Sequence, residues 1–119
     1  MNREPSRELL ERIADRLKAL ADPTRLRILH ALEDRERNVT ELLAAVGGSQ
    51  ANVSKHLARM RLAGIVSARR DGTNVFYHVA DAAAFAICRT VCDALEQRAE
   101  NERSVIAGGR GRLGGGVSR

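Results

Sequence analysis

A helical repeat of apolar residues between Ser49 and Gly64 is the clearest pattern in the chain. Val53, Leu57 and Met60 recur at intervals of four and three residues, which places them on one face of a helix. Ser49 can cap the start of this helix by accepting a hydrogen bond from a free backbone amide. Gly64 can supply the left-handed residue that commonly follows a helix. The pattern therefore predicts an amphipathic helix with a polar opposite face.

Three helices are predicted before this one, and the first two are longer than the third. The first covers residues 5–21, with Pro5 in its first turn, and its apolar residues recur with a period near 3.6. These apolar residues are Leu9, Leu10, Ile13, Leu17 and Leu20. Asp22 then caps a second helix, Pro23 takes its first position, and the helix runs to about Leu32.

A third, shorter helix is predicted over residues 39–46, after a charged loop with the sequence EDRER. Asn38 and Glu41 have the spacing of a capping box, in which each side chain accepts a hydrogen bond from the other residue's backbone amide. The Gly47-Gly48 pair breaks this helix, and the amphipathic helix follows at once. Two helices joined by a short glycine turn, the second of them basic and polar-faced, are typical of a helix-turn-helix.

Beyond the amphipathic helix the period changes from 3.6 to two, which is the period of a β-strand. Strands are predicted over residues 65–70 and 74–79, joined by a type I′ turn at Asp71-Gly72. A basic hairpin directly after such a helix is typical of the wing of a winged helix.

The last helix is predicted over residues 82–102, with Asp81 as its cap. Apolar residues recur along it in steps of three and four, at Phe85, Cys88, Cys92, Leu95 and Ala99. Such a seam packs against another helix, and the first helix offers a complementary stripe. The first and last helices are therefore predicted to form a homodimer interface. Residues 103–119 hold six glycines in 17 residues and are predicted to form a disordered tail.

Together these elements predict a mainly α fold with a small β-hairpin. Five helices and a two-stranded wing would form one winged helix-turn-helix domain over residues 1–102, and this domain would be homodimeric. A chain of 119 residues suffices for one domain with a modest core. Only 3% of the residues are aromatic, so aliphatic side chains must fill that core, which favours further burial against a second subunit.

The net charge of +5 is unevenly distributed along the chain. Residues 49–80 carry five basic side chains and one acidic one, whereas residues 81–102 carry two basic and five acidic ones. Basic charge concentrated in this way indicates a nucleic-acid binder. Amides can pair with adenine, and Lys or Arg can reach guanine or phosphate. The candidate DNA contacts are Gln50, Asn52, Lys55 and Arg59 on the helix, and Arg69, Arg70 and Asn74 on the wing.

Other interpretations fit parts of this pattern. The helix could be an ordinary surface helix with a solvated polar face, and Arg69 and Arg70 could protect an edge strand from pairing. A winged helix can also serve only as a protein-docking module, but docking surfaces are less basic than residues 49–80. No enzyme is expected, because no histidine lies on the last helix to activate Cys88 or Cys92 as a nucleophile.

The order and sequences of these elements resemble the arsenic-repressor (ArsR/SmtB) family of winged-helix repressors. The segments that carry the resemblance are ALADPTRLRIL, VTELLAAVGGSQANVSKHLARMRLAGIV and RRDGTNVFYHV, and it covers about residues 9–100. The resemblance implies a homodimer, joined through its first and last helices, that binds a two-fold symmetric operator and releases it when an inducer binds. It also implies that Gln50, Ala51, Ser54 and Lys55 read the DNA. Ala51 is a departure, since a serine is common there.

The resemblance does not extend to the family's sensor sites. Asn38 and Thr40 stand where arsenic and cadmium sensors have thiolate ligands. The positions of the family's zinc ligands on the last helix are Asp81, Ala83, Ala94 and Gln97. One ligand of four cannot hold zinc. His30, His56 and His78 lie on three different elements and are expected to be surface or wing residues.

Cys88 and Cys92 are the remaining soft ligands through which an inducer could act. They share one face of the last helix, and a dimer would bring up to four thiols near its axis. They could sense a soft metal, a metalloid, or a reactive sulfur or oxygen species. Equally, they could be small apolar residues that pack in the seam. Both alternatives stay open, and no other cofactor is expected.

The N-terminus is charged throughout and resembles no secretory signal, and the longest apolar run, Ala82 to Cys88, is too short to cross a bilayer. The protein is therefore expected in the cytoplasm, with reduced thiols. The predicted function is a sequence-specific transcriptional repressor whose partner is double-stranded DNA. The alternatives are a protein-docking module and a regulator of the same family that has no small-molecule inducer.

Overall fold

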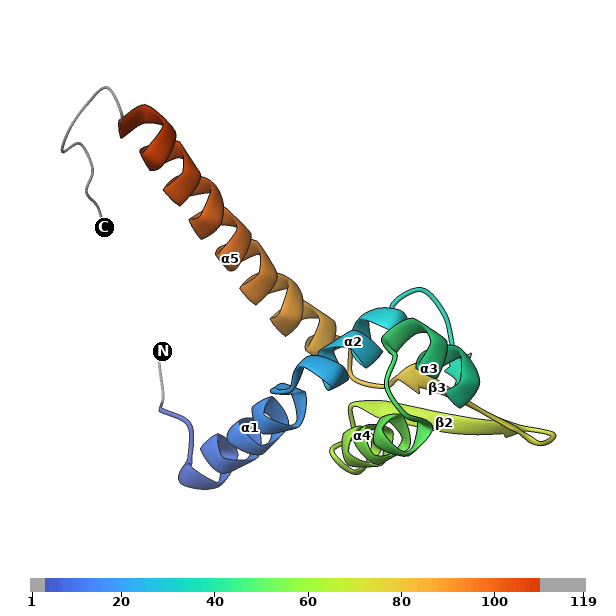
Figure 1. Cartoon of the computed structure of the whole chain (residues 1–119). Helices are drawn as coiled ribbons and strands as arrows, with labels where there is room; N and C mark the ends of the chain where they lie inside the picture. Colours follow the sequence, from blue (N-terminus) through green and yellow to red (C-terminus); the bar gives the residue numbers. More distant parts are fainter. Residues whose placement is uncertain (1–3, 110–119) are drawn as a thin grey trace. The chain divides into compact units, whose positions relative to one another are not determined.

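The computed structural model describes residues 4–109 of the chain (Figure 1). Over this range the chain forms five helices and three strands, and none of these helices is long and apolar enough to cross a membrane. In chain order the elements are α1 (Arg7–Leu20), α2 (Pro23–Ala31), β1 (Arg37–Asn38), α3 (Val39–Val46), α4 (Gln50–Leu62), β2 (Val66–Asp71), β3 (Asn74–Val79) and α5 (Ala82–Gly109). They divide into two compact units, of which the first ends at Phe85 and the second begins at Ala86, inside α5. The predicted mainly α, winged-helix fold is confirmed.

The predicted starts of the second, third and fourth helices are confirmed by side-chain caps. The Asp22 carboxylate accepts hydrogen bonds from the amides of Thr24 and Arg25 at 2.8 and 3.1 Å. Asn38 and Glu41 form both hydrogen bonds of a capping box, each 2.9 Å long. In α4, Ser49 is the cap. Because each cap satisfies free amides of a first turn, these three helices begin where the sequence predicts.

The start of α1 differs from the prediction. Ser6 caps the helix by accepting a hydrogen bond from the amide of Leu9 at 3.1 Å, so Pro5 lies before the cap and not in the first turn. The helix ends at Leu20, one residue earlier than predicted. A serine hydroxyl can satisfy a free amide of the first turn, whereas a proline side chain offers no acceptor, and this favours Ser6 as the boundary.

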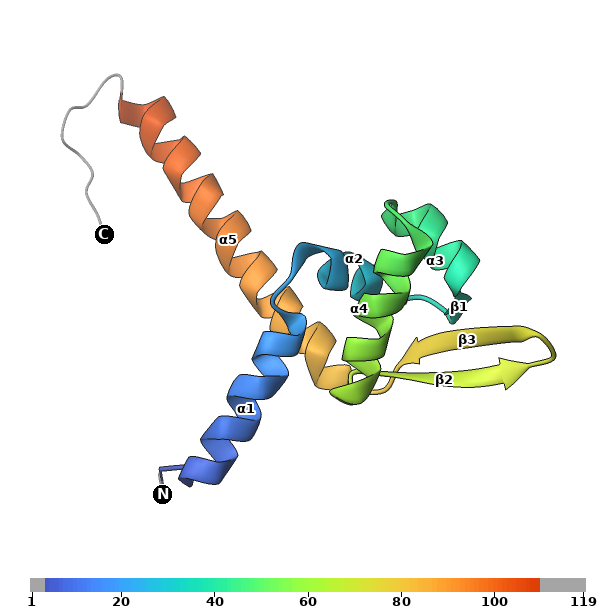
Figure 2. The ribbon, with the colours of Figure 1, turned by 60° about the horizontal axis from the view of Figure 1, so that its bottom comes forward.

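The core of the first unit lies among α2, α3, α4 and the base of the hairpin, with α4 beside β2 (Figures 1 and 2). Val53, Leu57 and Met60 are at most 1% exposed, which confirms the predicted apolar stripe of α4. They pack in a core whose other fully buried large side chains are Ile28, Leu29, Leu42, Ile65 and Val66. Because this stripe is buried, the opposite, polar face of α4 is turned to solvent.

The sheet has three strands in the order β1-β3-β2, so the predicted two-stranded wing is incomplete. The additional strand, β1, pairs antiparallel with β3 through Arg37 opposite Tyr77. A strand of two residues has no periodicity that sequence could reveal. The predicted turn is also shifted, because Asp71 pairs with Asn74 and leaves Gly72 and Thr73 as the loop.

The turn type differs from the prediction as well. A type I′ turn needs a positive φ at both loop residues, but of the two only Gly72 has one, at 66°. Glycine at the first loop position, followed by a residue with negative φ, matches the φ signs of a type II′ turn.

Helix α5 starts as predicted and ends later. The Asp81 carboxylate accepts a hydrogen bond from the amide of Ala83 at 3.0 Å, as a cap does. The helix continues to Gly109, so residues 103–109 are helical and the predicted end of this helix at residue 102 is wrong. Ion pairs between Arg98 and Glu102 and between Arg103 and Glu100 support this end of the helix. The rest of the predicted disordered tail, residues 110–119, lies outside the described residues.

Candidate nucleic-acid interface

The polar face of α4 stands open to solvent. The side chains that lie exposed there include Gln50, Ala51, Ser54 and Lys55, while Asn52 is half-buried. The turn that presents this face contains Gly47 and Gly48, with φ values of 86° and 87°. Side chains other than glycine rarely adopt this conformation, so the glycine pair suits this abrupt change of direction between α3 and α4.

The basic side chains of α4 are not engaged in ion pairs with described carboxylates. Lys55, Arg59 and Arg61 have no ion-pair partner among residues 4–109. Unpaired cations on an exposed helix face, with amide and hydroxyl side chains at its start, are suited to phosphate and base contacts.

A groove runs between α4 and the wing, and the sequence reasoning missed part of its lining. The groove has a volume of about 450 Å³ and is lined by Ser54, Ala58, Arg61, Leu62 and Tyr77. Ser54 is a predicted DNA contact, but Arg61 and Tyr77 are not. The spacing held a signal for Arg61, since it lies seven residues, or two helical turns, after Ser54 on the same face. No local pattern indicated Tyr77, because it reaches the groove from β3.

The two wing arginines face opposite sides of the sheet. Arg70 is paired with Val75 in the ladder, two positions from the pair of Ala68 and Tyr77, so its side chain shares the face of Tyr77 and of the groove. Arg69 is paired with Phe76 and lies on the other face. No ion pair of Arg70 occurs within the described part of the chain. Of these two predicted phosphate contacts, Arg70 is therefore the unpaired one.

Arg69 is held by Glu36, a residue of the loop before β1. Its Nε lies 2.9 and 3.0 Å from the two carboxylate oxygens of Glu36, and its Nη2 lies 2.8 Å from Oε1. The guanidinium also stacks on Phe76, with its carbon 5.0 Å from the ring centroid. Hydrogen bonding to Arg69 lowers the pKa of Glu36, and Glu36 in turn raises the pKa of Arg69. This pair joins residues 33 positions apart in the sequence.

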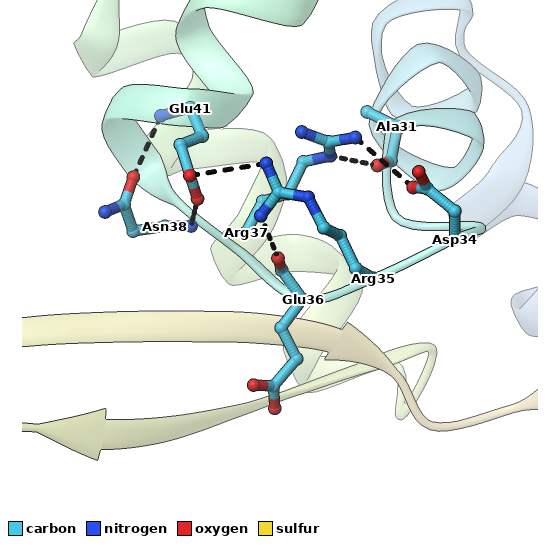
Figure 3. A network of polar contacts seen from close by, with 7 residues as sticks. All are labelled: Ala31, Asp34, Arg35, Glu36, Arg37, Asn38 and Glu41. Atoms are coloured by element: carbon cyan, nitrogen blue, oxygen red, sulfur yellow. Dashed lines mark hydrogen bonds and ion pairs between the residues drawn. The ribbon is translucent and has the colours of Figure 1, made fainter.

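The loop that carries Glu36 is fixed by its neighbours, as Figure 3 shows. Arg37 donates from Nε to the carbonyl of Ala31 at 2.5 Å and pairs with Asp34 at 3.2 Å. Arg35 donates to the Glu36 carbonyl at 3.1 Å and lies 3.5 Å from the Glu41 carboxylate. The Glu36 carboxylate points away from these residues toward β2 and β3.

A buried arginine connects α4 to the chain before it. Arg25 is only 9% exposed, and it donates to the carbonyls of Ala19 and Lys18 at 2.7 and 3.2 Å. Its Nη1 lies 3.1 Å from Nδ1 of His56, whose Nε2 faces the Asp22 carboxylate at 3.8 Å. An arginine can only donate, so Nδ1 of His56 accepts. The expectation that His56 is a surface residue is wrong, since 11% of its side chain is exposed.

The other two histidines match the expectation. His30 is exposed on α2, and His78 lies in the wing, where its Nδ1 is 3.6 Å from Glu36.

The surroundings of both thiols on α5 raise their pKa values. Cys88 is half-buried, and this burial raises the pKa of its thiol. Cys92 is exposed, and the adjacent Glu96 carboxylate raises the pKa of that thiol. The Cys92 sulfur and the carboxylates of Asp93 and Glu96 lie within 4.8 Å of one another, a spacing at which they could hold a metal ion. Raised pKa values favour the neutral thiol, which is a poor nucleophile.

Two of the residues at the family's sensor positions cap helices here. Asn38 caps α3, and Thr40 lies in the first turn of that helix. Asp81 caps α5 and forms an ion pair with Arg16 of α1.

Comparison with known proteins gives a consistent result. The model of the family described as "Bacterial regulatory protein, arsR family" matches residues 22–68. The transcriptional regulator KmtR of Mycobacterium tuberculosis is 45% identical over 67 residues, which are 56% of this chain and 52% of KmtR. The chain spans between 39% and 66% of the length of the curated relatives that it matches.

Two solved structures match most of the chain. The crystal structure of Mycobacterium tuberculosis Rv0081 has a TM-score of 0.72 and 36% identity, and the match covers 82% of this chain and 98% of that one. The homodimeric winged helix-turn-helix DNA-binding domain of Mb0332 from Mycobacterium bovis has a TM-score of 0.69 and 33% identity, with coverage of 82% and 95%. Family model, sequence relatives and structures thus agree with the geometry of α3, α4 and the wing, and the chain belongs to the ArsR family of bacterial regulatory proteins.

Proposed function

We propose that this protein is a transcriptional repressor that binds double-stranded DNA through α4 and the wing. The observation that carries the proposal is the exposed face of α4, where free cations lie next to amide and hydroxyl side chains and beside a groove that ends in the wing. The core of a protein-docking face is depleted of charged side chains, whereas Lys55, Arg59 and Arg61 are exposed on α4. Catalysis forms no part of the proposal.

The residues of α4 would make two kinds of contact, some to base edges and others to the DNA backbone. Gln50, Ser54 and Lys55 lie exposed in its first half, where they would contact base edges in the major groove. Ala51 and Asn52 lie in the same turn. Ala51 would contact the DNA through its methyl group, and Asn52 would offer one further side-chain amide. The proposed contacts to the DNA backbone are Arg59, Arg61, Arg70, Asn74 and Tyr77.

We further propose that the protein acts as a homodimer on an operator with two-fold symmetry. On α1, four leucine and isoleucine side chains remain between 43% and 48% exposed, and they are Leu9, Leu10, Ile13 and Leu17. On α5, Val91 and Leu95 are 52% and 62% exposed. A second copy would cover these faces, as the homodimeric state given for Mb0332 suggests. Residues 1–102 would then contain both functions, and the repressor would act in the cytoplasm.

Any inducer would act through the thiols of α5. Cys92 with Asp93 and Glu96 offers one soft and two hard ligands to a metal or metalloid ion, whereas the raised pKa values of Cys88 and Cys92 disfavour attack by thiolate. The test is operator release after arsenite, a persulfide donor or an oxidant, with Cys88→Ser/Cys92→Ser as the control. Equal responses in both proteins would leave a regulator without a thiol-sensed inducer.

The experiment that tests the main proposal is fluorescence anisotropy with a fragment of the protein's own promoter and a scrambled fragment of equal length. We expect tighter binding to the promoter, and an affinity that falls linearly on a logarithmic scale as salt rises. Equal affinities for both fragments, or no binding to either at 50 mM salt, would reject the repressor and favour the docking module.

A further inference from the structure

Arg69 and Arg70 are adjacent in β2, yet their surroundings differ. Arg70 lies on the groove face and is unpaired among the described residues, whereas Arg69 lies on the opposite face against Glu36 and Phe76. We propose that Glu36 restrains Arg69, so that Arg69 becomes a phosphate contact only when DNA displaces this carboxylate or a mutation removes it. The inference rests on the proposed DNA binding and names a residue that limits it.

The restraint follows from the donors that Glu36 occupies. A guanidinium recognises carboxylate and phosphate with the same fork of N–H groups, so the two anions compete for it. The Glu36 carboxylate already takes Nε and Nη2 of Arg69 at distances of 2.8 to 3.0 Å. Leaving Glu36 would also take the guanidinium off the Phe76 ring. To contact a phosphate, Arg69 must therefore give up its hydrogen bonds to Glu36 and its stacking on Phe76.

Glu36 cannot easily follow Arg69 toward DNA. The next residue, Arg37, pairs with Tyr77 in the sheet and donates to the carbonyl of Ala31. The Glu36 backbone carbonyl accepts from Arg35, and His78 faces the Glu36 carboxylate from β3. These contacts hold the Glu36 carboxylate beside the wing. The long side chain of Arg69 can still rotate away from it.

The restraint makes the wing less basic than its sequence indicates. Arg69 and Glu36 neutralise each other, and Asp71 lies 3.9 Å from the same guanidinium. Arg70 is then the unpaired cation of the two. We expect weaker DNA binding and a smaller salt dependence than two free arginines would give.

The experiment is a double-mutant cycle of Glu36→Gln and Arg69→Ala, measured as promoter affinity between 50 and 200 mM salt. Glu36→Gln keeps the size of the side chain but removes its charge and one of the two acceptor oxygens that hold Arg69. We expect it to tighten binding and to steepen the salt slope by ~0.9 for each protomer, so that its advantage shrinks about tenfold across this salt range in a dimer. Arg69→Ala should cost much more affinity in Glu36→Gln than in the wild type.

The matched control is Asp34→Asn, which removes the same charge from the same loop without touching Arg69. It should leave the salt slope unchanged. Arg69→Lys offers a second test if Glu36→Gln does not fold, because lysine keeps the charge but cannot form the two-point contact. It should also steepen the slope.

Several results would overturn the restraint. An Arg69→Ala cost that is equal in both backgrounds would show that Arg69 acts only through its distant charge. Unchanged slopes in Glu36→Gln and Arg69→Lys would show that Arg69 never reaches a phosphate. A wild-type protein that binds no DNA would instead reject the proposed function.

Discussion

Helices α4 and α5 are both amphipathic, but only α4 has its apolar face covered by its own chain. Val53, Leu57 and Met60 of α4 are at most 1% exposed. In α5, by contrast, no side chain between residues 86 and 108 is fully buried, and Leu95 remains 62% exposed. The same apolar stripe with helical period can therefore belong to a helix of the core or to a helix whose apolar face is left uncovered by its own chain. Helix α4 finds its packing partners within its own chain, whereas the apolar side chains of α5 would find theirs in a second copy.

The largest effect should follow from a charge on the uncovered face of α5. Leu95→Asp would bury two carboxylates in a dimer, one from each copy, at a cost of at least ~2 kcal/mol each. We expect sedimentation to show monomers, while Gln97→Asp, on another side of the same helix, should remain dimeric. A stable Leu95→Asp dimer would mean that α5 is not at the interface.

The covered face of α4 should respond through stability instead. Leu57→Ala removes a side chain that is 1% exposed and should cost about 2–5 kcal/mol in the free energy of unfolding, measured with denaturant. Leu62 lies in the same helix but is 90% exposed, so Leu62→Ala should change stability by less than ~0.5 kcal/mol. Similar losses in both variants would contradict the assignment of faces.

The open face of α4 should affect DNA affinity and leave stability intact. Gln50→Ala should cost ~1–3 kcal/mol of promoter binding and relax sequence preference, because an amide can pair with a base through two hydrogen bonds. Its melting temperature should match that of the wild type. An equal loss on scrambled DNA would show that Gln50 contacts the backbone and not a base.

The smallest effect concerns the reactivity of α5. Glu96 raises the pKa of Cys92, so Glu96→Gln should lower that pKa and increase the thiolate fraction near neutral pH. We expect faster alkylation of Cys92, followed by mass spectrometry, with Arg98→Gln as a control on the same helix. An unchanged rate would mean that Glu96 does not face the thiol in solution.

Sequence reasoning succeeded where the physics is local. Caps such as Asp22, Asn38 and Ser49 act within three residues, and the stripe of α4 repeats with the helical period, so both could be predicted. It failed where contacts join distant segments. No local pattern places Glu36 against Arg69, or His56 against Arg25, since 33 and 31 residues separate these pairs.

The end of α5 was mispredicted for a different reason. The glycines of residues 103–119 all lie after residue 107, so the first five residues, 103–107, contain none. An average over 17 residues concealed a stretch that can continue a helix.

The Arg25–His56 contact has a consequence for how this protein can change its target. His56 ties the middle of α4 to α2 and to the end of α1, whereas Gln50, Ala51, Ser54 and Lys55 are exposed. The positions that anchor the helix and those that face outward are thus different residues. Mutations can alter the outward set without disturbing the anchor. After a duplication of this gene, one copy could therefore acquire a new operator through substitutions at single exposed positions, while the contacts that hold α4 stay unchanged.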